Sequence, residues 1–185
     1  MKKINDYVKI YSNAISLEIC DKTIEELEST NFIKHKFYSQ SENKYYENEN
    51  EPFNSFDILN IEKKLMEIIY DKLKDYLKDI NHSWFGGWNG YSKLKYLKYT
   101  KNTKMNFHWD AITELFDGQR KGIPTLTVIG LLNDDFKGGD FIIFENKKIK
   151  LKKGDLIIFP STFLYPHGVN LIKNGIRYSF VSWVW

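Results

Sequence analysis

The sequence predicts an α+β fold in which covering helices precede a double-stranded β-helix (jelly roll), and two observations lead to this expectation. Residues 1–82 carry helical periodicity, whereas residues 92–185 consist of short strand-like runs separated by turns. Helices segregated from antiparallel strands are typical of α+β proteins, and about eight short strands suit a jelly roll. We expect a single domain over residues 1–185, with a helical part at about 1–82 and the jelly-roll core at about 92–185.

Two amphipathic helices are expected in the N-terminal part. The first covers residues 17–29 and would bury Cys20 as a structural thiol, because Leu17, Ile24 and Leu27 share its face. The second runs from about Asp57 to Ile80. Its apolar stripe comprises Ile58, Ile61, Leu65, Ile68, Ile69, Leu73, Tyr76 and Leu77. Between the helices, residues 39–54 are polar and partly acidic, which predicts an exposed loop.

The C-terminal half contains apolar or alternating runs with the length of β-strands. Gly, Asn and Asp in the intervening segments, such as residues 133–139, supply the conformations that tight corners need. The predicted strands cover residues 94–99, 106–110, 124–132, 140–144, 148–151, 155–159 and 177–185.

Composition and charge exclude several classes of protein. The net charge is only +3 and no block of like charge stands out, so we expect neither a nucleic-acid partner nor a membrane partner. One cysteine excludes an intramolecular disulfide and a multi-thiolate zinc site. With no signal peptide and no run of 18 apolar residues, a cytoplasmic (intracellular) location is expected. A Lys/Asn bias suggests a bacterial or viral genome, and the oligomeric state is left open.

A metal site is the main chemical signal in the sequence. His108 and Asp110 are two residues apart on a predicted strand, so both side chains project from one face. His167 follows the strand at 155–159 and is a candidate third ligand. Two histidines and one carboxylate form the facial triad of non-haem iron(II) oxygenases, which leaves coordination positions open on one side.

Arg177 adds a second signal, ten residues after His167 and at the start of the last predicted strand. A pocket for 2-oxoglutarate needs a fixed cation at its far end, because the C5 carboxylate of the cosubstrate must be paired once it is desolvated. The chain has only two arginines, and one of them stands at this spacing. A surface arginine on an edge strand is the alternative interpretation.

The segment HWD, then His167 in YPHGV, then Arg177 resembles the prolyl 4-hydroxylase-like branch of the 2-oxoglutarate/iron(II) dioxygenases. LLNDDFKGGDFIIF is similar to the strand–turn–strand of that branch, and KKGDLIIFPS is similar to the strand before its second histidine. The resemblance covers residues 92–185, and the preceding helices lie where the family has helices.

By position, the resemblance implies further contacts to 2-oxoglutarate. Tyr99 matches a tyrosine that hydrogen-bonds the cosubstrate, and Thr127 matches a hydroxyl that shares its C5 carboxylate with Arg177. Three apolar residues would line the same pocket, and each has barrel packing as its alternative: Leu131, Phe141 and Trp183. Some family members carry a tyrosine at the position of Leu131.

The resemblance implies an enzyme that uses iron(II), 2-oxoglutarate and O₂, with ascorbate as a candidate reductant, to hydroxylate a C–H bond. A protein or peptide residue, proline first, is the expected substrate. A free amino acid or other small molecule is the alternative within this class. A non-enzymatic jelly-roll binding module would be expected to have lost the triad or Arg177, and a cupin-type metalloenzyme would not need Arg177.

Substrate selection is expected in the loops at the mouth of the jelly roll. Two segments are candidates. One is residues 39–54, where Tyr45 and Tyr46 stand among carboxylates; the other follows the HWD segment, where Phe116, Asp117 and Arg120 could form a lid that contacts the substrate. His35 and His82 lie outside the motif, and we expect them to be surface or packing residues.

Overall fold

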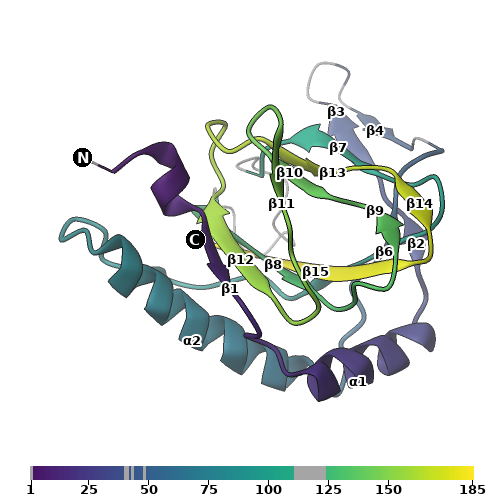
Figure 1. Ribbon diagram of the computed structural model, residues 1–185, viewed down its shortest axis with the longest axis horizontal. Helices are drawn as coiled ribbons and strands as arrows, with labels where there is room; N and C mark the ends of the chain where they lie inside the picture. Colours follow the sequence, from purple (N-terminus) through teal and green to yellow (C-terminus); the bar gives the residue numbers. More distant parts are fainter. Residues whose placement is uncertain (1, 40–41, 43, 48, 111–123) are drawn as a thin grey trace.

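Two antiparallel sheets face each other in the computed structural model, which describes residues 2–39, 42, 44–47, 49–110 and 124–185 (Figure 1). In this part of the chain the larger sheet has seven strands, in the order β1 (Lys9–Tyr11), β12 (Leu156–Pro160), β8 (Leu126–Leu131), β15 (Arg177–Val184), β6 (Lys95–Tyr99), β5 (Phe53–Ser55) and β2 (Ile33–Lys34). The smaller sheet has four, in the order β11 (Lys147–Ile149), β10 (Phe141–Ile143), β13 (His167–Val169) and β7 (Met105–His108). This arrangement of facing sheets with flanking helices confirms the predicted α+β jelly roll.

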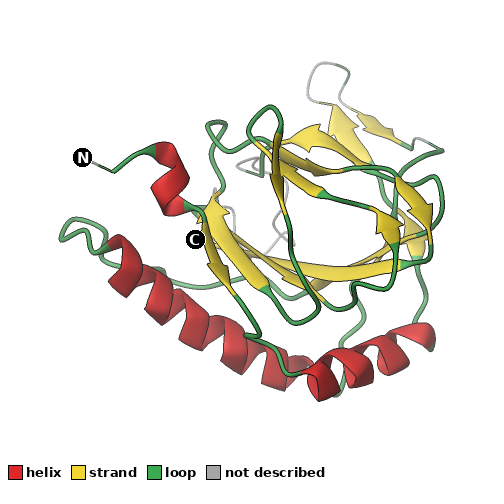
Figure 2. Cartoon of the chain, viewed as in Figure 1, coloured by secondary structure: helices red, strands yellow, loops and turns green. Residues whose placement is uncertain are grey.

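Two helices cover the outer face of the larger sheet, α1 (Leu17–Glu28) and α2 (Glu62–Ile80) (Figure 2). A short 3₁₀ turn, η1 (Ile4–Tyr7), precedes them. Ser16 caps α1 by accepting a hydrogen bond from the backbone N–H of Ile19, which satisfies one of the donors that a helix start leaves open. Neither described helix combines the length and the apolar character that crossing a bilayer requires.

Alternation along the strands creates two separate cores. In β15, Tyr178, Phe180 and Val184 pack beneath the helices, whereas Val181 and Trp183 point between the two sheets. The first core is completed by buried residues of both helices: Cys20, Leu27, Leu65, Ile69, Leu73, Tyr76 and Ile80. The second core lies between the sheets and surrounds the cavity described below.

The helix predictions are confirmed in position but not in every boundary. Cys20 is fully buried, as expected, and burial raises the pKa of its thiol to about 11. Leu17, predicted to share the buried face, is 58% exposed, and Thr23 is buried instead. The second helix begins at Glu62 and not at Asp57, whose carboxylate accepts a hydrogen bond from the Asn31 backbone N–H.

The expectation of an exposed loop over residues 39–54 is wrong for several described residues in it. A hairpin of β3 (Phe37–Ser39) and β4 (Lys44–Tyr46) projects there, and β5 joins the larger sheet. Glu51 and Pro52 are buried, and Asn106 donates a hydrogen bond of 3.0 Å to a Glu51 carboxylate oxygen. Each of these strands has only three residues, which is too few for hydrophobic alternation to reveal it.

All seven predicted strand segments contain strands, and the segments that sequence periodicity missed are very short. Besides β2 to β5, they are β1, β13, β9 (Lys137–Gly138) and β14 (Ile172–Asn174), and all have two or three residues. The paired glycines at 138 and 139 both have positive φ, and a Cβ on Gly138 would lie 2.2 Å from the Leu171 carbonyl oxygen. The turn into β10 therefore needs glycine at that position.

Candidate metal centre and its pocket

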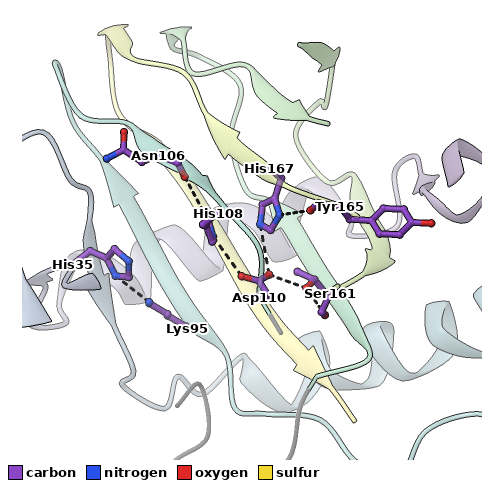
Figure 3. Close-up of polar contacts among 9 residues, drawn as sticks. His35, Lys95, Asn106, His108, Asp110, Ser161, Tyr165 and His167 are labelled. Carbon is purple, nitrogen blue, oxygen red and sulfur yellow. Dashed lines mark hydrogen bonds and ion pairs between the residues drawn. The ribbon is translucent and has the colours of Figure 1, made fainter. Parts of the chain in front are cut away.

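Three potential metal ligands converge where β7 ends and β13 begins (Figure 3). His167 pairs directly with His108 in the antiparallel register of these strands, so the two imidazoles lie side by side with ring centroids 4.5 Å apart. Asp110 follows β7 by two residues, and its backbone N–H donates to the Ser161 carbonyl just after β12. The ligand atoms of the three side chains lie within 4.8 Å of one another.

The Nε2 atoms of both histidines face the carboxylate. Nε2 of His108 lies 3.4 Å from Asp110 Oδ1, and Nε2 of His167 lies 3.5 Å from Oδ2. The Nδ1 atoms point away, 2.7 Å from the Asn106 carbonyl for His108 and 3.2 Å from the Tyr165 carbonyl for His167. A ring that donates Nδ1–H to a carbonyl presents a lone pair on Nε2, which is the form that binds a metal.

The ionisation of the cluster suits a cation. Burial alone would raise the pKa of Asp110, but His167, His108 and the Thr127 hydroxyl hold it well below its usual value. Burial lowers the pKa of His167 to about 4, so this ring is neutral. Burial opposes protonation of His108 as well, yet its hydrogen bond to Asp110 raises the pKa above the ordinary value. The Asp110 carboxylate and the neutral His167 ring are donors that a divalent ion requires, and His108 becomes one by releasing its proton when the ion binds.

A cavity of about 600 Å³ opens beside this cluster, between the two sheets. Besides the three ligands, its walls include Tyr99, Phe141, Arg177 and Trp183, all of which the sequence placed in this pocket. The alternation of side chains along β15 explains why both of its predicted residues line the cavity. Arg177 and Trp183 are six residues apart and therefore share a face of the strand.

Arg177 is a buried cation at one end of the cavity. Its side chain is 1% exposed, and its guanidinium lies 5.0 Å from the centre of the Tyr99 ring. One guanidinium nitrogen donates to Ser179 Oγ at 2.8 Å, whereas Nε is buried with no hydrogen-bond partner. Burial lowers the pKa of Arg177, and within the described ranges no carboxylate forms an ion pair with it. A buried guanidinium in this state is suited to receive an anion.

Two predicted pocket residues lie elsewhere. Thr127 does not reach Arg177, because the register of β8 sets it opposite Trp183, and its hydroxyl donates to Asp110 Oδ2 at 2.8 Å. Leu131 is buried but is absent from the cavity wall, where its strand contributes Ile129. The hydroxyl beside Arg177 belongs to Ser179, which sequence analysis missed although it shares the face of Arg177 on the last strand.

Sequence analysis also missed two polar residues in the wall. His35, expected at the surface or in packing, is 8% exposed and lines the cavity together with Lys95. Nζ of Lys95 lies 3.1 Å from His35 Nδ1. The signal for Lys95 was its spacing of four from Tyr99, which places both side chains on one strand face. His82 hydrogen-bonds the Tyr7 hydroxyl and stacks on Trp84, away from the cavity.

The proposed lid residues Phe116, Asp117 and Arg120 lie outside the described residues. Tyr45, from the other candidate segment, lines the cavity, and three further exposed aromatic side chains lie at its described mouth: Phe56, Phe107 and Trp109.

Comparison with known proteins agrees with this geometry. The model of the 2OG-Fe(II) oxygenase superfamily matches residues 94–185. A PKHD-type hydroxylase of Prochlorococcus marinus is 43% identical over 91 residues, which make up 48% of this chain and 40% of that protein. The PKHD-type hydroxylase PiuC of Pseudomonas aeruginosa is 31% identical over 91 residues, 46% of this chain and 39% of the relative. The chain therefore matches about 40% of the length of these relatives.

Solved structures share the fold over nearly the whole chain. A viral collagen prolyl hydroxylase from Paramecium Bursaria Chlorella virus-1, in complex with 2-oxoglutarate, has a TM-score of 0.69 and 17% identity, covering 96% of this chain and 95% of that one. A prolyl hydroxylase from Trichoplax adhaerens, in complex with a peptide of hypoxia inducible factor, also has a TM-score of 0.69 and 17% identity, covering 97% and 84%. At this identity the likeness establishes the fold.

Proposed function

Because this chain belongs to the 2OG-Fe(II) oxygenase superfamily, we propose that it is a hydroxylase that uses iron(II), 2-oxoglutarate and O₂ to oxidise a C–H bond of a protein or peptide residue, proline first. The peptide-bound prolyl hydroxylase among the structures of the same fold supports this choice of substrate. A free amino acid or other small molecule is the alternative substrate.

The metal-binding residues fit iron(II). His108, His167 and Asp110 provide two imidazole nitrogens and one carboxylate from one side, which matches the 2-His-1-carboxylate set of non-haem iron oxygenases. Each ligand has an outer partner: the Asn106 and Tyr165 carbonyls for the histidines, and the Thr127 hydroxyl for Asp110. Such partners fix the orientation of the ligands before the metal arrives.

The observation that carries the proposal is the buried Arg177 in the same cavity as the triad. A guanidinium without a carboxylate partner in the described chain needs a bound anion to offset its desolvation. The C5 carboxylate of 2-oxoglutarate provides one, and Ser179 and Tyr99 lie beside the guanidinium to help hold it. Phe141, against His167, would cover the chain of the cosubstrate.

When bound together, iron(II), 2-oxoglutarate and O₂ supply the oxidising power: one oxygen atom enters the substrate C–H bond as hydroxyl, and 2-oxoglutarate becomes succinate and CO₂. The protein contributes positioning. His108 and His167 hold their Nε2 atoms toward one point, and Arg177 fixes the far end of the cosubstrate. Apolar walls such as Ile129 and Val181 exclude water from the reacting centre.

A non-enzymatic binding module is the competing function. Such a module does not need metal-binding side chains that are oriented by hydrogen bonds, as His108 is by the Asn106 carbonyl. It does not need the buried cation Arg177 in the same cavity either. Both features are present, and they favour the enzyme.

Titration with iron(II) and 2-oxoglutarate under anaerobic conditions, followed by mass spectrometry of candidate peptides after exposure to O₂, tests the proposal. We expect one iron per chain, succinate formation and a mass increase of one oxygen in the substrate peptide. His108→Ala and His167→Ala should abolish succinate formation while the circular dichroism spectrum stays unchanged. Normal turnover by either variant would contradict the metal assignment.

We also propose that the protein works in a reducing compartment such as the cytoplasm. Its one cysteine, Cys20, is a free thiol buried under α1, where it serves packing and not cross-linking.

A further inference from the structure

A second buried cation lies in the wall of the cavity, at Lys95. Its side chain is directed inward from β6, on the same face as Tyr99, and the residue is 8% exposed (Figure 3). Its ammonium donates to Nδ1 of His35 at 3.1 Å. Burial and the charge of Lys95 together lower the pKa of His35 to about 3, so the ring is neutral and contributes no charge.

Lys95 has no carboxylate in ion-pair contact among the residues that the structure describes. Asp110 attracts it only from a longer distance, because the Asp110 oxygens face His108, His167 and Thr127. Burial lowers the pKa of Lys95 to about 8, which still leaves most of the side chain protonated at neutral pH. The cavity therefore contains a positive charge that the metal site and Arg177 do not account for.

Trp183 supplies an independent second observation. Its indole ring lies beneath the ammonium of Lys95, with 5.8 Å between Nζ and a ring centre. The indole Nε1 is buried and has no hydrogen-bond partner, although an indole N–H can only donate. A buried donor without an acceptor is costly, so an unsatisfied N–H on the ring beneath a buried cation indicates a missing acceptor group.

This donor pair is separate from Arg177. Tyr99 pairs with Arg177 in the sheet register, whereas Lys95 pairs with Val181, four residues further along. Four residues of strand span roughly 13 Å. The cavity thus has a cation toward each end of the β6–β15 pair, and the metal ligands line the same cavity.

We propose that Lys95 and Trp183 bind a carboxylate of the substrate, so that the compound hydroxylated by this protein is an acid. The proposal rests on the function proposed above and names its substrate class. One ammonium and one neutral N–H balance a single negative charge shared by two oxygens, which suits a carboxylate better than a phosphate dianion. The carboxylate belongs either to a free amino acid or to an acidic residue beside the oxidised one in a peptide.

Pairs of probes that differ only in having an acid or an amide group test the proposed carboxylate site by binding alone, without the oxidation reaction. The protein is loaded with Mn(II) and 2-oxoglutarate without O₂, and two pairs of probes are titrated by calorimetry. One pair is N-acetyl-L-proline and N-acetyl-L-prolinamide; the other is a proline-containing peptide with Asp next to the proline and the same peptide with Asn. We expect the acid of at least one pair to bind at least tenfold more tightly than its amide. The pair that shows the preference identifies the source of the carboxylate.

Substitutions of Lys95 and Trp183 test whether these residues cause the preference for the acid over the amide. Lys95→Met should remove it, Trp183→Phe should reduce it, and Lys95→Arg should retain part of it. Lys98→Met is the matched control, because Lys98 lies on the same strand but faces Tyr178 and Glu28 on the other side of the sheet. That variant should keep the full preference. Thermal melts confirm that each variant is folded before titration.

Three results would overturn the proposal. The first is that wild-type protein binds neither acid, or binds acid and amide equally. The second is that the preference survives in Lys95→Met. The third is that Lys95→Met weakens the binding of 2-oxoglutarate tenfold, which would make Lys95 part of the cosubstrate site. A failure of the proposed function is detected in a separate experiment: the iron-loaded wild-type protein would form no succinate in the presence of O₂. The calorimetric comparison of acid and amide does not depend on that reaction.

Discussion

Lys95 and Arg177 place two positive charges inside the jelly roll, and within the described chain neither is in ion-pair contact with a carboxylate. Burial of an unpaired charge opposes folding, so both residues are costly in the protein without ligands. Their retention in a cavity wall is typical of residues kept for binding and not for stability.

Lys95→Met should therefore stabilise the unliganded protein. The pKa of Lys95 is lowered from 10.5 in the unfolded chain to about 8 in the folded one, which corresponds to a cost of about 3 kcal/mol when both states are protonated. Below pH 8 this cost is fully present. Between pH 8 and pH 10.5 the unfolded state binds more protons than the folded state, so stability rises with pH and the cost disappears.

Urea denaturation at pH 7 and at pH 10 measures this difference. Lys95→Met should exceed the wild type in free energy of unfolding by up to about 3 kcal/mol at pH 7 and by much less at pH 10. Lys98→Met, on the other face of β6, should show neither effect. A Lys95→Met variant less stable than the wild type at pH 7 would show that the ammonium is compensated within the protein.

Arg177→Ala should weaken the binding of 2-oxoglutarate and leave the binding of the metal unchanged. Loss of a buried charge partner costs about 2–5 kcal/mol, which lowers the affinity by one to three orders of magnitude or more. Arg177→Lys should be milder, because a point charge still reaches the carboxylate without the paired N–H groups. Equilibrium titration of 2-oxoglutarate in Mn(II)-loaded protein gives the values, and an unchanged affinity in the alanine variant would place the anchor elsewhere.

Thr127→Val separates the two roles available to that hydroxyl. In the structure it orients Asp110, so its removal should weaken Mn(II) or iron(II) binding about 10- to 100-fold. The affinity for 2-oxoglutarate at saturating metal should change little. The opposite pattern, intact metal affinity with weakened 2-oxoglutarate, would restore the contact to the C5 carboxylate that family resemblance implies.

At the scale of elements, sequence periodicity identified the long helix, the apolar strands and the order in which they occur. The spacing of two between His108 and Asp110 predicted candidate metal ligands, and the structure brings His167 within 4.8 Å of them. Periodicity does not resolve strands of two or three residues such as β9 and β13, which have too few positions to alternate.

Register explains the errors within the site. Family position placed Thr127 beside Arg177, but the partner of each residue depends on how β8 and β15 align, which a single sequence does not show. The burial of His35 depends on the pairing of β2 with β5, where the strands have only two and three residues. Such long-range pairing follows from the folded topology and not from local pattern.

The packing of β8 against β15 gives a test at this scale. Gly130 faces Phe180 across the two strands, and a Cβ on Gly130 would lie 2.2 Å from the phenyl ring. Gly130→Ala should lower the free energy of unfolding by about 1–3 kcal/mol through overpacking. Gly86→Ala is the control, because a Cβ there meets no atom within 4 Å. Equal urea midpoints for the two variants would mean that Phe180 moves aside without cost.

At the scale of the whole molecule, bound Mn(II) and 2-oxoglutarate should stabilise the fold, because they bind between the two sheets. The cavity separates the two sheets, and its walls carry the unpaired cations and the metal ligands. Saturation with a ligand at 100 times its dissociation constant adds about 2.7 kcal/mol, which for a chain of this size raises the melting temperature by roughly 5–11 °C. We expect such a rise with Mn(II) and a further rise with 2-oxoglutarate.

Differential scanning fluorimetry follows these shifts, and EDTA should reverse them. In Arg177→Ala the rise caused by Mn(II) should persist and the further rise caused by 2-oxoglutarate should be lost. If 2-oxoglutarate stabilised the protein equally with and without Mn(II), it would not share the metal cavity.

The position of β15 in the larger sheet has a consequence for how the protein reaches its fold. β15 lies between β8 and β6, and it is the last strand of the sequence. The sheet therefore cannot close on a growing chain until residue 184 has left the ribosome, and its apolar strands are exposed until then. Pairings this distant in sequence also slow folding, to the range of milliseconds to seconds. During synthesis, the edges of β8 and β6 that later pair with β15 stay open, and open strand edges favour aggregation.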